Sequence, residues 1–298
     1  MTNARRQVHG TGAARRLALV TALGIACGLE PVPQQPAQPS QPSQPQQTPP
    51  ATPQPTVPPA GYQLAFEDDF LGTSLDTTKW TALSGPRRDA VNTPAAVSVA
   101  NGLLTLTTYT QAGVHKTGFV TTEGAFAARY GYFEAHIRFH DAPGSWCAFW
   151  ISAHSVDFGG DPAVNGDEID AVEHRVTDQG GWTELADMVA LNVNWNGYGP
   201  DKKTAQLVAH LPDNSKVQGQ WHTYGVLWTS DAYVYYVDGT AIWRPQAPIS
   251  QIAEDVRLTC EVQDASWAGY VPPGGYGTLA TSTTKMDVDW VRVWQPPH

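Results

Sequence analysis

Charged side chains are scarce in this chain, and basic ones are the scarcer kind. Asp, Glu, Lys and Arg make up 15% of its 298 residues, and 28 acidic against 18 basic side chains give a formal net charge of −10. Four of the arginines precede residue 17, and Glu30 is the only acid before residue 61, so the rest of the chain is more acidic still. A surface of this sign repels phosphate backbones and anionic lipid. We therefore expect no nucleic-acid partner.

Long apolar runs are also missing, apart from one near the N-terminus. The segment LALVTALGIACGL, residues 17–29, follows Arg15 and Arg16. Its length suits a signal-peptide core and falls short of the ~20 residues that span a bilayer. A buried helix of the fold is the alternative. We predict a signal peptide over residues 1–30, and hence an extracellular, bacterial-surface or periplasmic protein. Cys27 follows Gly-Ile-Ala as at a lipoprotein processing site, so a lipid anchor at Cys27 competes with free secretion.

Residues 31–61 are built almost entirely from Pro, Gln, Ser, Thr and Ala. Such a segment has no apolar surface to offset the entropy of ordering, and its prolines favour an extended polyproline II conformation. We predict a disordered linker that holds a folded domain away from a membrane or a cell wall.

Helical periodicity longer than a turn or two is absent from residues 62–298, which contain all 11 tryptophans. Short runs with strand-like alternation recur there instead, punctuated by Gly, Pro, Asn and Asp. No repeat of fixed period occurs, which argues against a propeller or solenoid. We predict one all-β sandwich or barrel that acts as a monomer. The runs are VSVA (97–100), LLTLTTYT (103–110), GYFEAHIRF (131–139), DMVALNVNW (187–195), WHTYGVLWT (221–229), AYVYYVDG (232–239), VRLTCEV (256–262) and MDVDWVRVW (286–294).

Cysteine is rare, with three residues in all. Cys27 belongs to the export segment, which leaves Cys147 and Cys260 as an even pair in a domain bound for an oxidising compartment. A disulfide requires alpha carbons ~4.4–6.8 Å apart, and therefore neighbouring strands. Two separate buried thiols are the alternative.

Four carboxylic acids fall within seven residues of GDEIDAVEH (166–174). Strand side chains alternate between faces, which puts Glu168 and Asp170 on one face and Glu173 on the other. A single β-bulge after Asp170 would return Glu173 to the face of Glu168. Two leaning glutamates could then bring their carboxyls to about 5 Å, the spacing of nucleophile and acid/base in a retaining glycosidase. A metal site and a solvated acidic edge are the alternatives, although the interleaved Ile and Val favour a strand.

The stretch EIDAVE resembles the catalytic signature of family 16 glycoside hydrolases in its six-residue, bulged form. The resemblance covers residues 62–296 and implies a concanavalin A-like β-jelly-roll sandwich with a sugar-binding cleft on its concave sheet. It also implies that Glu168 is the nucleophile, Asp170 an assisting acid and Glu173 the general acid/base, with no required cofactor. The segments that follow the family's order are FEDDF, RYGYFEAHIRF, GSWCAFWIS, NWNGYG, WHTYGVLW, YVDG and DVDWVRVW.

The longer signature is similar to that of enzymes acting on β-1,3-glucans and marine galactans. We expect an endo-acting, retaining hydrolase with a β-1,3-glucan as substrate; a galactan such as agar, porphyran or carrageenan, and transglycosylation, are the alternatives. A non-catalytic lectin would keep the fold and the tryptophans without requiring both glutamates. The chain departs from the family at Asn194, where histidine is common, at His136, where arginine is, and at Cys147, where proline is. These departures leave the substrate open.

Sugar rings present apolar faces to aromatic planes, so exposed aromatic side chains are the expected binding groups. Trp146 and Trp150, four residues apart ahead of the acidic strand, should share one face. For His174, which follows the acid/base, a structural hydrogen-bonding role is the alternative, and for Glu261 a surface role. Trp290 and Trp294 are expected in the core. The candidates for substrate binding are Trp146, Trp150, His174, Asn194, Trp195, Glu261 and Trp267.

Related domains of this family often bind calcium on the convex face. The matching positions in this sequence are Glu67, the carbonyl of Gly102, and Asp289. Hard oxygen ligands suit calcium, and a bound ion would add stability by linkage. We therefore expect a possible structural calcium in addition to a cofactor-free active site.

Overall fold

The structure is a computed structural model that describes residues 57–297, and its layers follow from the two-residue period of its strands. In β10 (Gly131–His140), Phe133, Ala135 and Ile137 are completely buried, whereas His136 and Arg138 keep some exposure. Alternation of this kind covers one face of a sheet with apolar side chains, and that face has to pack against a second layer.

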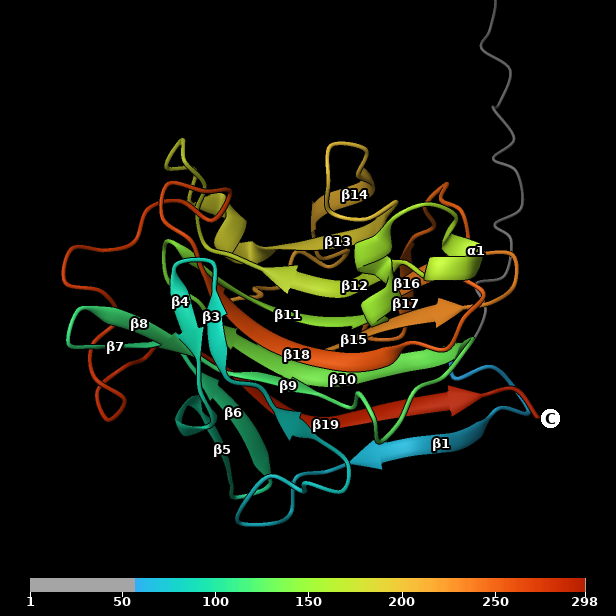
Figure 1. The fold of residues 1–298 in the computed structure, drawn as a ribbon, viewed down its shortest axis with the longest axis horizontal. Helices are drawn as coiled ribbons and strands as arrows, with labels where there is room; N and C mark the ends of the chain where they lie inside the picture. Colours follow the sequence, from blue (N-terminus) through green and yellow to red (C-terminus); the bar gives the residue numbers. More distant parts are fainter. Residues whose placement is uncertain (1–56, 298) are drawn as a thin grey trace, which may run out of the picture. The chain divides into compact units, whose positions relative to one another are not determined.

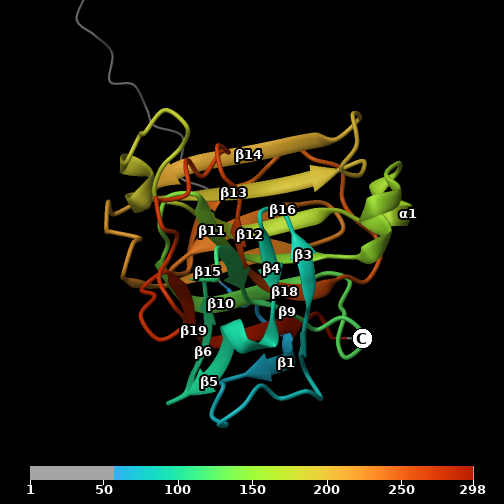
Figure 2. The ribbon, with the colours of Figure 1, turned by 60° about the vertical axis from the view of Figure 1, so that its left-hand side comes forward.

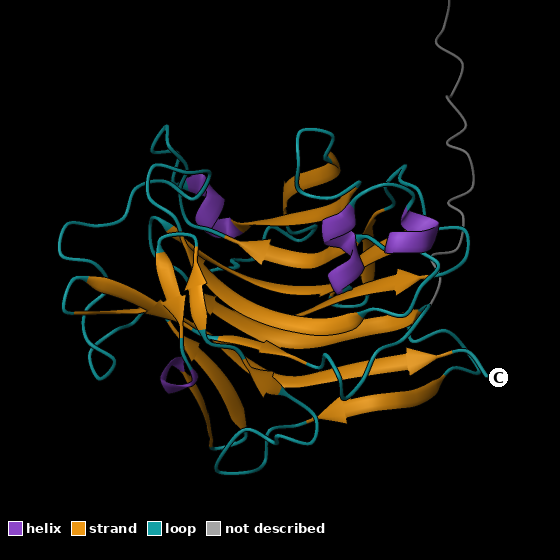
Figure 3. Ribbon diagram, in the orientation of Figure 1, coloured by secondary structure: helices purple, strands orange, loops and turns teal. Residues whose placement is uncertain are grey.

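Two large sheets face each other, and a small third sheet accompanies them (Figures 1 and 3). The first sheet contains, in spatial order, β17 (Thr240–Trp243), β16 (Tyr233–Val237), β15 (Trp221–Trp228), β10, β19 (Lys285–Gln295), β6 (Leu103–Thr107) and β5 (Val97–Ala100), with β1 (Gln63–Asp68) paired to β19. The second sheet contains β14 (Lys203–His210), β13 (Met188–Trp195), β12 (Glu168–His174), β11 (Ser145–Ser152), β18 (Asp255–Val262), β9 (Phe119–Thr121) and β2 (Thr81–Ala82). The small sheet contains β3 (Gly85–Arg87), β4 (Ala90–Asn92), β8 (Val114–Thr117) and β7 (Tyr109–Gln111).

Helix is confined to single turns in residues 57–297 (Figure 3). These are α1 (Pro162–Asn165) and three 3-10 turns, η1 (Pro94–Ala96), η2 (His154–Phe158) and η3 (Glu184–Asp187). The sequence explains the start of α1, because Asp161 caps the Ala163 N–H and Pro162 occupies the first turn. No helix in this part of the chain is long and apolar enough to cross a membrane.

The apolar core lies between the two large sheets, and β11 shows how the second sheet divides its side chains. Cys147, Phe149 and Ile151 point into the core, whereas Ala148 and Trp150 belong to a separate cluster on the opposite face. One face of the second sheet is therefore free to carry a site. The all-β sandwich expected from the sequence is confirmed.

Cys147 and Cys260 form a disulfide bond within that core. They stand directly opposite each other on the neighbouring strands β11 and β18, with their alpha carbons 4.0 Å apart. The bridge that the sequence left open is thus present, and it joins strands 113 residues apart in the chain.

The β3–β4 hairpin lies in front of the second sheet in both ribbon views (Figures 1 and 2). Its tip carries Arg87 and Arg88, and Arg88 adopts a positive φ of 51° that non-glycine residues rarely take. This turn brings two cations over β11 and β12.

Several expectations fall outside the described residues, namely the signal peptide, the lipid anchor at Cys27 and the linker up to residue 56. Val57, which the sequence assigned to the linker, packs on the cluster of Tyr132, Leu227 and Tyr236. The expectation that Trp290 and Trp294 lie in the core was wrong. Trp290 stacks on His136, and Trp294 packs on the cluster of Tyr132, Leu227 and Tyr236, because the alternating Val291 and Val293 take the core-facing positions of β19.

Candidate active site

The three acids of β12 share one face because the strand carries a bulge. Trp150 of β11 pairs with Asp170, but the next residue back, Phe149, pairs with Val172, so Ala171 is the extra residue. The pairing with β13 shifts between Asp170 and Glu173 as well. The bulge expected from the sequence is therefore confirmed. Glu168, Asp170 and Glu173 line one cavity of about 30 Å³, while Ala171 and Val172 are buried in the core.

Asn194 on β13 holds two of these acids at once. Its Nδ2 donates to Glu168 Oε1 at 2.7 Å and to Asp170 Oδ2 at 3.0 Å. Thr204 on β14, the cross-strand partner of Asn194, donates to Asn194 Oδ1 at 2.7 Å. The hydroxyl thereby fixes which end of the amide faces the acids. Asn194, where the family commonly has histidine, is thus part of the site.

Asn192 supports Glu173 in the same way. Its Nδ2 donates to Glu173 Oε2 at 2.6 Å, and Gln206 Nε2 on β14 donates to Asn192 Oδ1 at 2.6 Å. Two parallel chains of hydrogen bonds therefore run from β14 through β13 to the acids of β12. Such chains hold reactive carboxyls in fixed rotamers, as preorganised catalysis requires.

Two of these acids, Glu173 and Asp170, have a raised pKa. Burial, followed by the negative charges of Glu168 and Glu261, raises the pKa of Glu173 to about 8, although Arg88 and Lys202 act against this. Burial, followed by the charges of Glu168 and Glu173, raises the pKa of Asp170 well above its ordinary value. At neutral pH Glu173 is thus protonated and suited to a general acid.

Tyr198, in the loop after β13, was missed by the sequence analysis. Its hydroxyl donates to Oε2 of Glu168. The residue as a whole is 47% exposed, but its hydroxyl is enclosed beside Glu168. That local burial and the charge of Glu168 raise the Tyr198 pKa, so the phenol keeps the proton that it donates. The segment NWNGYG was noted for its tryptophan, and the tyrosine three residues later carried no periodic signal.

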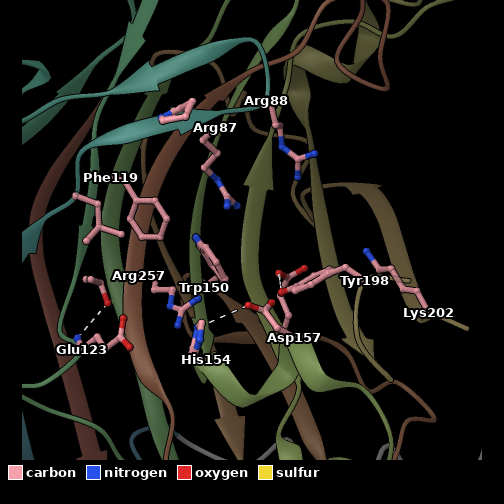
Figure 4. A pocket seen from close by; sticks show the side chains of 14 residues that line it. Arg87, Arg88, Phe119, Glu123, Trp150, His154, Asp157, Tyr198, Lys202 and Arg257 are labelled. Atoms are coloured by element: carbon pink, nitrogen blue, oxygen red, sulfur yellow. Dashed lines mark hydrogen bonds and ion pairs between the residues drawn. The ribbon is translucent and has the colours of Figure 1, made fainter. Parts of the chain in front are cut away.

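Two pockets meet at the acids. The first, about 580 Å³, extends from Glu168 past Trp150 and Tyr198 towards the β3–β4 hairpin, whose Arg87 and Arg88 enter it (Figure 4). The second, about 320 Å³, extends from Glu168 and Glu173 past Trp146. Further residues of the first are Leu83, Pro86, Phe119, Thr121, Glu123, His154, Asp157, Lys202 and Arg257, and of the second Arg88, Asn192, Asn194, Lys202, Thr204, Gln206 and Trp267. A polymer crossing both would place an internal bond at the acids.

The tryptophans expected to bind sugar line these pockets, but they expose little surface. Trp150 is 5% exposed and Trp146 is 2% exposed. Guanidinium groups approach the rings, with Arg257 4.8 Å from the Trp150 ring and Arg88 5.0 Å from that of Trp146. A guanidinium group therefore lies over each indole and limits the ring surface that a sugar could reach.

Trp267 and Glu261 also belong to the site. Trp267 packs edge-on against Trp146 at 5.4 Å, and the Arg175 guanidinium lies 4.2 Å from its ring. Glu261 accepts a hydrogen bond from Arg87 Nη2 at 2.8 Å and another from Arg88 Nε. Glu261 therefore anchors the hairpin tip above the acids rather than facing an open cleft.

Two candidates for substrate binding were wrong. His174 is completely buried; its Nδ1 lies 2.9 Å from Asp141 Oδ2, and its Nε2 donates to the Ala186 carbonyl at 3.0 Å. Trp195 packs against the core between the sheets. Both follow a cleft-facing residue by one position, Glu173 and Asn194, so alternation turns them to the opposite face.

The residues expected to bind calcium do not fit such a site well. Lys79 Nζ donates to the Glu67 carbonyl at 2.8 Å, and the carboxylate of Asp289 bonds His136 Nδ1 at 2.9 Å. The pocket beside Glu67 is lined by neither Gly102 nor Asp289, and residues 57–297 contain no group of three His, Cys, Asp or Glu side chains suited to a metal. Calcium stays a prediction, which a fall in melting temperature on adding EDTA would support.

Comparison with known proteins agrees with this geometry. Residues 63–296 match the family model described as beta-porphyranase A-D, GH16 domain. The chain belongs to glycoside hydrolase family 16. That match covers more than three quarters of the sequence and includes the bulged strand β12 with all three acids.

Individual members of family 16 are moderately similar. The chain is 34% identical over 206 residues to endo-1,3-1,4-beta-glycanase ExsH of Rhizobium meliloti (strain 1021), covering 66% of this chain and 39% of that protein. It is 24% identical over 274 residues to glucan endo-1,3-beta-glucosidase A1 of Niallia circulans, covering 79% and 38%. The chain thus spans less than half the length of these relatives.

Among solved structures, porphyranase B from Zobellia galactanivorans has the same fold. The TM-score is 0.65 at 22% identity, covering 78% of this chain and 92% of that one. At this identity the likeness concerns the fold, and it supports the jelly-roll sandwich.

Proposed function

We propose that the chain is an endo-acting, retaining glycoside hydrolase that cleaves a polysaccharide. The observation that carries the proposal is the bulge at Ala171, which brings Glu168, Asp170 and Glu173 onto one face, where Asn192 and Asn194 hold them. A lectin on the same sandwich needs neither this bulge nor the two hydrogen-bond chains.

The reaction follows from the positions and protonation of the acids. Glu173, protonated at neutral pH, gives its proton to the glycosidic oxygen while the Glu168 carboxylate attacks the anomeric carbon. The bond between that carbon and the glycosidic oxygen breaks, the leaving sugar departs as an alcohol, and a glycosyl ester of Glu168 remains. The Glu173 carboxylate then takes a proton from water, which attacks the same carbon and releases Glu168. Asp170 assists from between them through its shared donor Asn194. Transglycosylation differs only in that a sugar hydroxyl replaces the water.

The arginines at the cleft, together with the family model, favour an anionic galactan over the neutral β-1,3-glucan expected first. Arg87, Arg88, Lys202 and Arg257 line the first pocket, which Glu123, Asp157 and Glu168 line as well. Glu261 pairs with Arg87 and Arg88, and Asp255 pairs with Arg257, so much of this positive charge is balanced. Cations concentrated in a cleft attract acidic groups on a polymer, and the porphyranase-type family model points in the same direction.

A substrate panel with product analysis tests both parts. We expect hydrolysis of porphyran or carrageenan to exceed that of laminarin, lichenan, agarose and xyloglucan, and rising salt to reduce the preference because it screens the arginines. NMR during the first turnovers should show β-anomers from a β-linked chain. Initial α-anomers would refute the retaining mechanism, and a preference for laminarin would return the substrate to β-1,3-glucan.

Export is proposed from the sequence alone. A signal peptide over residues 1–30 would place the domain outside the cytoplasm, with either free secretion or a lipid at Cys27. Palmitate labelling of the full chain in a bacterial host decides between these, with Cys27→Ser as the control. Label in the wild type that is lost in Cys27→Ser supports the anchor, and absence of label in the wild type supports free secretion.

A further inference from the structure

Two carboxyl groups, next to the first residues of β12 and β18, are buried and have no cationic side chain as a partner. Asp167 precedes β12 directly, Glu254 precedes β18 directly, and both are completely buried. Among residues 57–297, no Lys, Arg or His forms an ion pair with either. Two uncompensated charges in such a place would be very costly.

Hydrogen bonds link the two groups into a ring that leaves one oxygen of each carboxyl without a partner. Tyr233 OH donates to Asp167 Oδ2 at 2.9 Å and accepts from Ser250 N at 2.8 Å. Ser250 Oγ donates to Glu254 Oε1 at 2.6 Å, and the same oxygen accepts from Asp167 N at 2.9 Å. Asp167 Oδ1 and Glu254 Oε2 are left buried with no partner. Both oxygens can only accept a hydrogen bond when the carboxyls are ionised, so each of them lacks a donor.

We propose that Asp167 and Glu254 share a proton as an acid–carboxylate pair, and that this pair is a positioning element for the nucleophile Glu168. A proton on either carboxyl turns one of the two unpartnered oxygens into a donor and removes one of the two buried charges. The positioning role rests on the proposed function, whereas the shared proton does not.

The position of the pair explains how it acts on Glu168. Glu254 Oε1 holds the peptide N–H of Asp167, one residue before the nucleophile, and thereby the entry of β12. The chain also passes close to Glu254 at Gly166: a Cβ there would lie 2.7 Å from the same oxygen, at a φ of +84°. Repulsion between two ionised carboxyls would therefore displace the backbone that carries Glu168.

Neighbouring charges reinforce the shared proton. Burial raises the pKa of Asp167 to about 7 and that of Glu254 to about 8. Asp161 before α1 acts on Asp167, whereas Asp167 itself and Asp255 on β18 act on Glu254, and the Tyr233 hydroxyl on β16 bonds Asp167; none of these groups is a cation. The folded chain thus keeps a proton that the unfolded chain releases, so stability falls as pH rises from about 4 to about 8.

Thermal unfolding of the full chain at pH 5 and pH 8.5 tests the shared proton. In Glu254→Gln the amide nitrogen replaces Oε2 and mimics the protonated carboxyl with a permanent donor. We expect its melting temperature to fall at least about 3 °C less between these pH values than that of the wild type. Glu184→Gln, at an exposed position, should fall like the wild type. Asp167→Asn provides a second variant with the same expectation. If the melting temperature of both amide variants falls between these pH values as much as that of the wild type, the proposal is wrong.

The pH dependence of kcat tests positioning. Glu173 loses its proton over this pH range in the wild type and in all the variants. A difference between variants in the ratio of kcat at pH 8.5 to kcat at pH 6 therefore measures the effect of ionising Asp167 and Glu254. We expect this ratio to be at least about threefold higher in Glu254→Gln than in the wild type and in Glu184→Gln. An unchanged ratio beside a changed melting profile would overturn positioning and leave the shared proton. If the wild type hydrolyses no polysaccharide, the proposed function fails and positioning with it, while the melting profiles still decide the shared proton.

Discussion

Tyr198 donates a hydrogen bond to Oε2 of Glu168, the oxygen that Asn194 does not hold. The nucleophile is therefore oriented from two sides, by an amide from β13 and by a phenol from the loop that follows it. Because the phenol keeps its proton, it acts as a donor throughout the working pH range. The carboxylate does not depend on substrate for its orientation.

Removing the phenol should impair catalysis without harming the fold. In Tyr198→Phe we expect kcat/KM to fall about tenfold, because a hydrogen bond to a charged group contributes about 1.5–3 kcal/mol. Tyr270→Phe, at another exposed tyrosine, is the matched control and should retain wild-type kinetics. A value within twofold of wild type for Tyr198→Phe would show that Asn194 alone orients Glu168.

Replacing either reactive acid should nearly abolish turnover. Glu168→Gln and Glu173→Gln each remove a charge or a proton with little change in volume, and we expect kcat to fall by at least about a hundredfold. Circular dichroism should show an intact fold in both. Azide should restore turnover to Glu168→Gly with an inverted product, because the small anion replaces the nucleophile. Substantial turnover in either glutamine variant would contradict the assigned roles.

The pH profile should report the proton of Glu173. Its pKa of about 8 means that kcat/KM stays high at neutral pH and falls as pH rises through about 8, because the acid form is needed for the first step. Glu261→Gln removes a nearby negative charge and should move this alkaline limb to lower pH. Arg88→Met removes a cation and should move it to higher pH. Shifts in the same direction would mean that the electrostatic account is wrong.

The disulfide between Cys147 and Cys260 should contribute strongly to stability. It closes a loop of more than 100 residues, for which the chain-entropy model gives about 4–5 kcal/mol. At about 2–4 °C per kcal/mol for a domain of this size, Cys147→Ala/Cys260→Ala should melt about 10 °C lower. In the unreduced wild type, neither Cys147 nor Cys260 should take up a thiol label after denaturation. Labelling of both cysteines would show that the bridge does not form.

Alternation and a single bulge are local rules, and they explain why the acids of β12 could be placed from the sequence. The same rule, applied to the residues after Glu173 and Asn194, turns His174 and Trp195 towards the core, and it therefore argues from the sequence against a substrate-binding role for either. The sandwich, the near absence of helix in residues 57–297, and the reactive acids all follow from short-range order in the chain.

Other features depend on which strands become neighbours, and nothing local determines that. Asn192 reaches Glu173 only through the pairing of β12 with β13, and the hairpin tip at Arg88 comes to lie on Glu261, 173 residues later in the chain. The same holds for Cys147 opposite Cys260 and for Asp167 beside Glu254. By itself, the sequence determined the fold class and the chemistry of the three acids, because alternation and residue type are encoded locally. Only the tertiary structure decided which groups hold those acids, what charge the cleft carries and where a buried proton can reside, because each depends on contacts between residues far apart in the chain.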